Sequence, residues 1–281
     1  GPGTLKFLQY LAANDLDKPP GAAIYTQLCN ERGGIEADLT IMRIREQAFY
    51  IVTGSGFGVR DGQWIISHMP NDGTVVFRDV TSERAVINLC GPESRRVLEK
   101  VTADDVSNDG FPYMQCRKVE IGYASVLAIR VTYVGELGWE LHMPQEFSSH
   151  VYETLRDAGA LYFTHLRDEG NAVIDALLEA MEFAEQVNVH VQIVHMKLSG
   201  TDNWGGASKV MSLLGEARES GVKIDCDIYP YTAASNPLKN LMPPWLQEGG
   251  VGEMLARLGE PELRARIKHE VGRAGLNNFG R

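Results

Sequence analysis

The stretch RDAGALYFTHLRDEG, residues 156–170, separates two segments of the chain that have different sequence patterns. Its first residues continue an amphipathic helix, whereas residues 161–165 resemble a short strand that ends in a histidine. Before this stretch, β-rich runs alternate with turns. After it, strands alternate with helices. We therefore expect two domains, residues 1–160 and residues 161–281, that meet here.

The first segment is expected to have an α+β fold with largely antiparallel sheets. Strand patterns occur at residues 22–30, 35–44, 48–54, 74–80, 85–91, 116–123 and 125–135. Helix patterns occur at residues 59–68, 92–100 and 147–157. The pair Gly33-Gly34 predicts a hairpin turn, which would bring Tyr25 and Asp38 close together on paired strands.

The second segment predicts an α/β fold, a partial βα-barrel. Its strand patterns occur at residues 161–165, 189–195 and 222–231, and its helix patterns at 172–186, 207–221 and on both sides of Pro261. His165 and His195 each end a predicted strand, and one βα unit separates them. Neighbouring strands lie roughly 5 Å apart, so both imidazoles could reach one ion. The open sheet edges favour an oligomer that covers them.

Composition limits the function classes. The chain has 281 residues, of which 44% are hydrophobic and 23% charged, as expected for a folded protein. The net charge of -10 argues against nucleic-acid binding, because phosphate neutralisation needs clustered Lys and Arg. A small-molecule substrate is therefore the expected partner.

The four cysteines and the hydropathy pattern indicate the cellular compartment in which the protein is expected. Cys29, Cys90, Cys116 and Cys226 are far apart and contain no CxxC pair, which favours a reducing cytoplasm. No apolar run approaches the roughly 20 residues that cross a bilayer, so no membrane contact is expected.

Three runs of the first segment resemble the aminomethyltransferase (glycine cleavage T-protein) family, in the form fused to dimethylglycine and sarcosine dehydrogenases. They are GAAIYTQLCNERGGIEADLTIMRI (21–44), FRDVTSERAVINLCGPESRRVLEKVT (77–102) and RVTYVGELGWELHMP (130–144). The resemblance implies a tetrahydrofolate site in which Asp38 is the acid beside the reacting nitrogen and Glu136 binds the pterin. Tyr25 and Tyr133 match pocket positions. The family's chain extends on both sides of this region, so the pocket is expected to be only partly encoded.

Glu136 also has an interpretation that does not depend on the family. It lies between Gly135 and Gly138, where the backbone can approach a ligand closely while the carboxylate is held in a turn. An ordinary hairpin turn is the alternative.

Four runs of the second segment resemble the N-acyl-D-amino-acid deacylase (D-aminoacylase) branch of the amidohydrolase superfamily. They are YFTHLRDEGNAVIDALLEAMEFAEQ (162–186), VQIVHMKLSG (191–200), VKIDCDIYPYTAASNPL (222–238) and LMPPWLQEGG (241–250). The resemblance implies that His165 and His195 are zinc ligands, with Lys197 and Tyr229 on the substrate side. The family's other ligands have no counterpart, so we expect any zinc to bind weakly.

The leading hypothesis is an incomplete tetrahydrofolate-binding, aminomethyltransferase-like module of one-carbon, dimethylglycine and sarcosine metabolism. Zinc-dependent amide hydrolysis at His165 and His195 is one alternative. A catalytically inert fusion of two fragments is another. The two resemblances together predict a chimera that is engineered, arises from misassembled DNA, or is a natural fusion.

Overall fold

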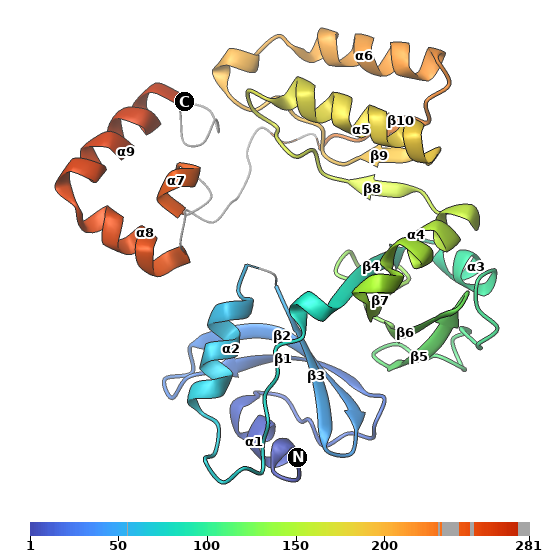
Figure 1. Ribbon diagram of the computed structural model, residues 1–281, viewed down its shortest axis with the longest axis vertical. Helices are drawn as coiled ribbons and strands as arrows, with labels where there is room; N and C mark the ends of the chain where they lie inside the picture. The colour runs from blue at the N-terminus through green and yellow to red at the C-terminus, as the bar shows by residue number, and fades with distance from the viewer. Residues whose placement is uncertain (55, 230, 232–241, 248–249, 275–281) are drawn as a thin grey trace. The chain divides into compact units, whose positions relative to one another are not determined.

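The computed structural model describes residues 1–54, 56–229, 231, 242–247 and 250–274 (Figure 1). Pro230 and the segments 232–241 and 248–249, which contribute to the runs quoted above, lie outside the described residues, as do Ser55 and residues 275–281. The chain forms two compact units, Gly1–Ala160 and Leu161–Arg281. No helix of the described part is both long and apolar enough to cross a membrane.

The first unit begins with a three-stranded antiparallel sheet in the order β1-β2-β3. Its elements are α1 (Thr4–Leu11), β1 (Ala23–Cys29), β2 (Ile35–Arg45), β3 (Ala48–Thr53) and α2 (Gly58–Ser67). One core joins the apolar sides of α1, α2 and the sheet, and it includes Phe7, Leu28, Ile41 and Ile65. The other side of the β1–β2 hairpin is exposed at Tyr25 and Asp38, whereas Ala23 and Met42 at its opposite end are buried against Cys116 and Ile129 of the second sheet.

A second antiparallel sheet in the same unit has the order β4-β7-β6-β5. Its elements are η1 (Thr81–Glu83), β4 (Arg84–Cys90), α3 (Ser94–Glu99), β5 (Cys116–Ile121), β6 (Ala124–Ile129), β7 (Gly138–Pro144), η2 (Gln145–Phe147) and α4 (Ser148–Asp157). Trp139 on β7 is fully buried in the core of this sheet, together with Phe111, Leu141 and Val151. The α+β architecture with antiparallel sheets is confirmed for this unit.

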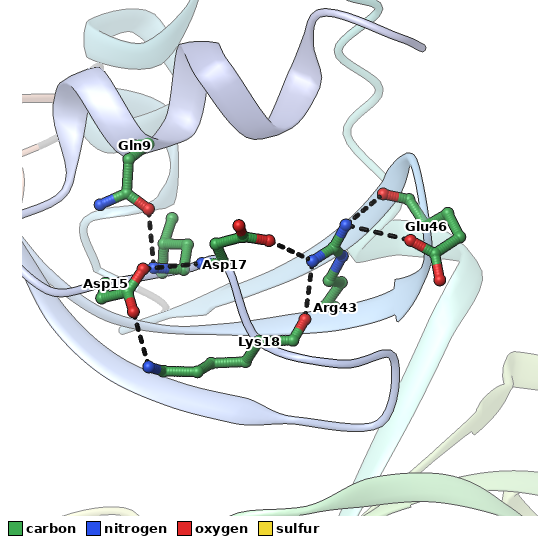
Figure 2. A network of polar contacts seen from close by, with 7 residues as sticks. Gln9, Asp15, Asp17, Lys18, Arg43 and Glu46 are labelled. Carbon is green, nitrogen blue, oxygen red and sulfur yellow. Dashed lines mark hydrogen bonds and ion pairs between the residues drawn. The ribbon is translucent and has the colours of Figure 1, made fainter.

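Arg43 on β2 ties the hairpin to the loop that precedes β1. Its guanidinium donates to the Asp17 carboxylate at 2.9 Å, to the Lys18 carbonyl at 2.7 Å, and to the Glu46 carbonyl and carboxylate at 3.1 and 3.2 Å (Figure 2). The side chain is buried although both carboxylates are exposed. These bonds fix the loop against the hairpin that carries Asp38.

We predict that Arg43→Ala lowers the free energy of unfolding by about 2 kcal/mol, because it removes charge-assisted hydrogen bonds and leaves the Lys18 carbonyl without its partner. Urea denaturation followed by circular dichroism measures the change. Arg45→Ala is the matched control on the same strand, since Arg45 is exposed, and we expect it to cost at most about 0.5 kcal/mol. Equal effects of the two substitutions would contradict the stabilising role of Arg43.

The second unit contains a three-stranded parallel sheet in the order β10-β9-β8. Its elements are β8 (Tyr162–Thr164), α5 (Val173–Val187), β9 (Val191–Ile193), η3 (Thr201–Asn203), α6 (Ala207–Glu219), β10 (Ile224–Cys226), α7 (Pro244–Gln247), α8 (Gly250–Gly259) and α9 (Pro261–Ala274). The sheet shares one core with α5 and α6 that includes Leu177, Ile193 and Leu214 (Figure 1). This is the predicted βα repeat. The barrel remains a prediction, because the described strands form an open sheet.

The structure corrects some predicted elements of the first unit. The sequence pattern predicts a strand at residues 74–80, but they form no strand ladder, and only Val75 among them is buried. The predicted strand 125–135 ends at Ile129, because the chain turns into the loop that carries Tyr133 and Glu136. The sequence analysis predicts no helix at α1 and no separate strand at β7, and both are present.

Candidate functional site

Asp38 lies on the exposed face of the β1–β2 hairpin with two side chains hydrogen-bonded to it. Gln27 is directly opposite Asp38 in the strand register, and its amide nitrogen donates to the carboxylate at 2.9 Å. Tyr25 is one diagonal step along the same face. A hydrogen bond to Asp38 is the main reason that the pKa of its phenol lies above the usual value. The hairpin therefore brings Tyr25 and Asp38 together, as its predicted register requires.

The geometry leaves Asp38 suited to interact with an amine. Two donors, from Tyr25 and Gln27, contact the carboxylate and orient it. Tyr25 is 52% exposed, so the group is open to solvent rather than enclosed in the core. The sequence analysis does not identify Gln27. The alternation of the strand could have revealed it, since Tyr25 and Gln27 are two residues apart and share a face.

Tyr133 and Glu136 lie in the loop between β6 and β7. Gly135 has a left-handed φ of 78°, which a residue with a side chain adopts only with strain. At Gly138 a Cβ atom would lie 2.5 Å from the Leu89 carbonyl oxygen, so this position admits only glycine without displacement of β4. Both glycines of the predicted turn are therefore required by the backbone.

The loop places Glu136 near the end of β4 and leaves the Tyr133 side chain exposed. The Thr132 hydroxyl donates to the Glu136 carbonyl at 2.6 Å and closes the loop. Burial, and secondarily the charge of Glu136, raise the pKa of the Cys90 thiol, which places this carboxylate beside the end of β4. The Tyr133 side chain is fully exposed. Tyr25, Gln27 and Asp38 lie on the first sheet, whereas Tyr133 and Glu136 lie on a loop of the second.

His165 and His195 meet at the C-terminal ends of β8 and β9, which are neighbouring parallel strands. The Nδ1 atom of His165 and the Nε2 atom of His195 are 2.5 Å apart. The contact is a hydrogen bond in which one imidazole must donate, because two lone pairs would repel each other, and the donor depends on the tautomers. The predicted convergence of the imidazoles is present in the structure.

The other side of the His195 ring faces a charged pair. Its Nδ1 atom is 3.0 Å from the Glu169 carboxylate and 2.9 Å from the Lys197 ammonium, which are themselves 2.5 Å apart. The Asp227 carboxylate accepts a hydrogen bond from the backbone N–H of His195 at 2.7 Å. His195 itself has a left-handed φ of 39°. Lys197 also stands 5.8 Å from the ring centroid of Tyr229. The sequence analysis does not identify Glu169 or Asp227.

These side chains do not form a complete metal centre in the described part of the chain, where no group of three or more His, Cys, Asp or Glu residues could hold an ion. Glu169 contacts the nitrogen of His195 that faces away from His165, so it orients the ring rather than completing a ligand set. The imidazole of His190 bonds to the Asp225 carboxylate at 2.7 Å.

The GCVT N-terminal domain family matches residues 1–177, which include the hairpin with Asp38 and the loop with Glu136. This chain belongs to that family. Among curated relatives, it is 33% identical over 163 residues to the pyruvate dehydrogenase phosphatase regulatory subunit of Mus musculus, covering 58% of this chain and 19% of that protein. It is 36% identical over 160 residues to the dimethylglycine dehydrogenase of Rattus norvegicus, covering 57% and 19%. It is 36% identical over 161 residues to an aminomethyltransferase of Geobacillus kaustophilus, covering 57% and 43%.

The GCVT relationship covers only part of these relatives, since the chain spans about a fifth of the length of the first two. Among solved structures, a crystal structure of D-aminoacylase is 34% identical over 32% of this chain and 19% of that chain, with a TM-score of 0.30. A similarity of that extent leaves the amidohydrolase assignment as a proposal.

Proposed function

We propose that this chain is a tetrahydrofolate-binding, aminomethyltransferase-like module of the dimethylglycine and sarcosine dehydrogenase type. The observation that carries the proposal is the group formed by Tyr25, Gln27 and Asp38 on the exposed face of the hairpin. Family membership supports the general assignment, and the names of the relatives support one-carbon and methylamine chemistry. The small-molecule substrate is part of this proposal.

Asp38 is proposed to act on the amine that receives the one-carbon unit. Its carboxylate can accept an N–H from a bound amine and stabilise the positive charge that develops there. Tyr25 and Gln27 hold the carboxylate in place, so the carboxylate loses less orientational freedom when the amine binds. Tetrahydrofolate, when bound, supplies the nitrogen that carries the transferred unit.

Glu136 is proposed to bind the amino-pyrimidine edge of the pterin, where two parallel N–H donors can meet two carboxylate oxygens. The position of its carboxylate on a loop fixed by Gly135 and Thr132 supports this role. Tyr133 is proposed as a pocket residue. Its full exposure means that it would have to fold over the ligand.

Titration of the full chain with tetrahydrofolate, with Tm as the readout, tests the proposal. A ligand that binds only the folded state raises Tm, and the rise grows with the logarithm of the ligand concentration above its dissociation constant. No rise at saturating tetrahydrofolate would contradict folate binding. One relative is named a regulatory subunit, so binding and catalysis need separate measurements.

A second proposed function, zinc-dependent amide hydrolysis, is favoured by the convergence of His165 and His195 on one point. Zinc, when bound, would polarise the amide carbonyl and lower the pKa of a bound water. With two imidazoles and no third ligand among the described residues, the expected affinity is low.

We predict that elemental analysis after dialysis against a low concentration of zinc finds less than one zinc ion per chain, and that the double variant His165→Ala/His195→Ala lowers this value to background. The physical reason is that the two imidazoles supply all the nitrogen ligands at this point. His190→Ala is the matched control, because its imidazole bonds to Asp225. Zinc retained by the double variant would exclude these histidines as ligands. If neither tetrahydrofolate nor zinc binds, the inert fusion is favoured.

Location and assembly are further proposals. Four free cysteines favour a reducing compartment such as the cytoplasm, whereas two of the relatives above are mitochondrial by name.

β8 and β10 are the edges of the parallel sheet among the described strands, so we propose that an oligomer covers them. The domains are proposed as a folate-binding region, residues 1–160, and an amidohydrolase-like segment, residues 161–281.

A further inference from the structure

Two arginines of the first unit share one neutral hydrogen-bond acceptor. The Nη2 atom of Arg95 donates to the Asn108 side-chain oxygen at 2.8 Å, and the Nη2 atom of Arg130 donates to the same oxygen at 2.6 Å. Both guanidinium groups therefore lie within hydrogen-bond distance of a single atom. Like charges at this separation repel, and an amide oxygen offsets that repulsion less than a carboxylate would.

The two guanidinium groups have no ion-pair partner among the described residues. Neither forms a contact of 4 Å or less with a carboxylate, whereas the adjacent Arg96 pairs with Glu93 at 2.8 Å. Asp105 is a carboxylate whose pKa lies below its usual value. Ser107 chiefly lowers its pKa, and the charges of Arg117 and Arg95 contribute less. Burial, and then the charge of Arg95, lower the pKa of Arg130, as expected for a cation that lacks a counter-charge.

Besides Asn108, the ring of Trp139 and one backbone carbonyl contact the pair. The guanidinium carbons of Arg95 and Arg130 stand 5.6 and 5.9 Å from the ring centroid of Trp139. The indole N–H of Trp139 is buried and has no acceptor in the described structure. Arg130 uses one more donor on the Phe111 carbonyl at 2.5 Å, while Arg95 has no other hydrogen bond among the described residues. Guanidinium groups have more donors than these contacts use.

Access from solvent is open. Asn108 is exposed, and the side chains of Arg95 and Arg130 are only partly buried. A planar anion with two oxygens could therefore displace the Asn108 amide and accept from both guanidinium groups, in the bidentate geometry that arginine favours. Trp139 below them provides a rigid apolar floor that limits the mobility of the cations.

We propose that Arg95 and Arg130, with Asn108 as the group they hold in the absence of ligand, form a binding site for an oxyanion, a carboxylate or a phosphate. The site belongs to the second sheet of the unit, on α3 and at the end of β6. It does not depend on the proposed folate function. Its ligand would be recognised by charge and by paired acceptor oxygens rather than by shape.

The test compares Tm of the full chain in about 50 mM phosphate, acetate or chloride at matched ionic strength. A site with a dissociation constant of about 10 mM predicts a rise of about 3 °C in phosphate over chloride. A rise in acetate as well identifies a general oxyanion site, and a rise in phosphate alone identifies a phosphate site. No rise with either anion overturns the proposal and assigns the counter-charge to Asp105 or Asp109.

Substitutions make the test specific. Asn108→Asp would place a carboxylate between the two guanidinium groups, so we expect a higher Tm in chloride and loss of the anion response. Arg95→Gln is expected to lose the response without filling the site. The control Arg96→Gln should keep it, because Arg96 pairs with Glu93. An unchanged response in both Asn108→Asp and Arg95→Gln would place the anion elsewhere and overturn the proposal.

Discussion

Asp38→Asn is expected to remove most of the rise in Tm that tetrahydrofolate gives to the unsubstituted chain. The substitution keeps the shape of the side chain and an oxygen for the Gln27 amide, which donates at 2.9 Å in the native structure. It removes the charge that is proposed to accept the N–H of the bound amine. Loss of a charge-assisted hydrogen bond corresponds to a dissociation constant that is about 10- to 100-fold larger. Thermal titration of both proteins with tetrahydrofolate measures the difference.

A measurement without ligand separates this result from misfolding. The ionised Asp38 keeps the pKa of Tyr25 above its usual value, because it accepts the phenol hydrogen bond and its charge disfavours the tyrosinate. Asp38→Asn should therefore lower the pKa of Tyr25. The titration of Tyr25 is obtained by subtracting the absorbance titration of the same protein with Tyr25→Phe. Asp15→Asn is the control, since Asp15 is exposed and pairs with Lys18. An undiminished folate response in Asp38→Asn would exclude Asp38 from the site.

The hairpin that carries Asp38 could be predicted because its signals are local. Alternating residues define the faces of β1 and β2, and Gly33 has the left-handed φ of 75° that its turn needs. The βα repeat of the second unit is equally predictable from the apolar stripe of α5. Both features depend on the order of residues within one or two elements.

Elements that depend on distant contacts are harder to predict. The run 74–80 is rich in β-branched and aromatic residues, yet no neighbouring strand pairs with it, so its propensity alone does not make a strand. β7 is the reverse case. It begins at Gly138, a poor strand former, and is stabilised by pairing with β4 on one side and β6 on the other.

In the candidate sites, too, contacts between neighbouring strands could be predicted, whereas contacts made by loop residues could not. Pairing of β1 with β2 and adjacency of β8 and β9 follow from topology, so the contact between Tyr25 and Asp38 and the convergence of His165 and His195 could be predicted. Glu169 lies in the loop after β8, and no periodic pattern places a loop side chain beside His195. The sharing of Asn108 by Arg95 and Arg130 likewise joins a helix, a loop and the end of a strand.

Trp139→Ala is expected to destabilise the protein more than Arg43→Ala, by about 4 kcal/mol. The side chain is fully buried, and the cavity left by its removal would lie in the core between the second sheet and its helices, next to Phe111 at a ring-centroid distance of 6.3 Å. A domain is typically stable by roughly 5–15 kcal/mol, so this loss is a large part of the total. Urea denaturation followed by circular dichroism measures it.

Two further variants show whether packing explains the loss. Trp204→Ala, at a tryptophan that is 73% exposed, should cost within about 0.5 kcal/mol and controls for the residue type. Trp139→Phe keeps an aromatic ring and loses an indole N–H that has no acceptor in the described structure, so its cost should come from volume alone and be well below that of alanine. If Trp139→Phe were as destabilising as Trp139→Ala, the indole N–H would have an acceptor in solution.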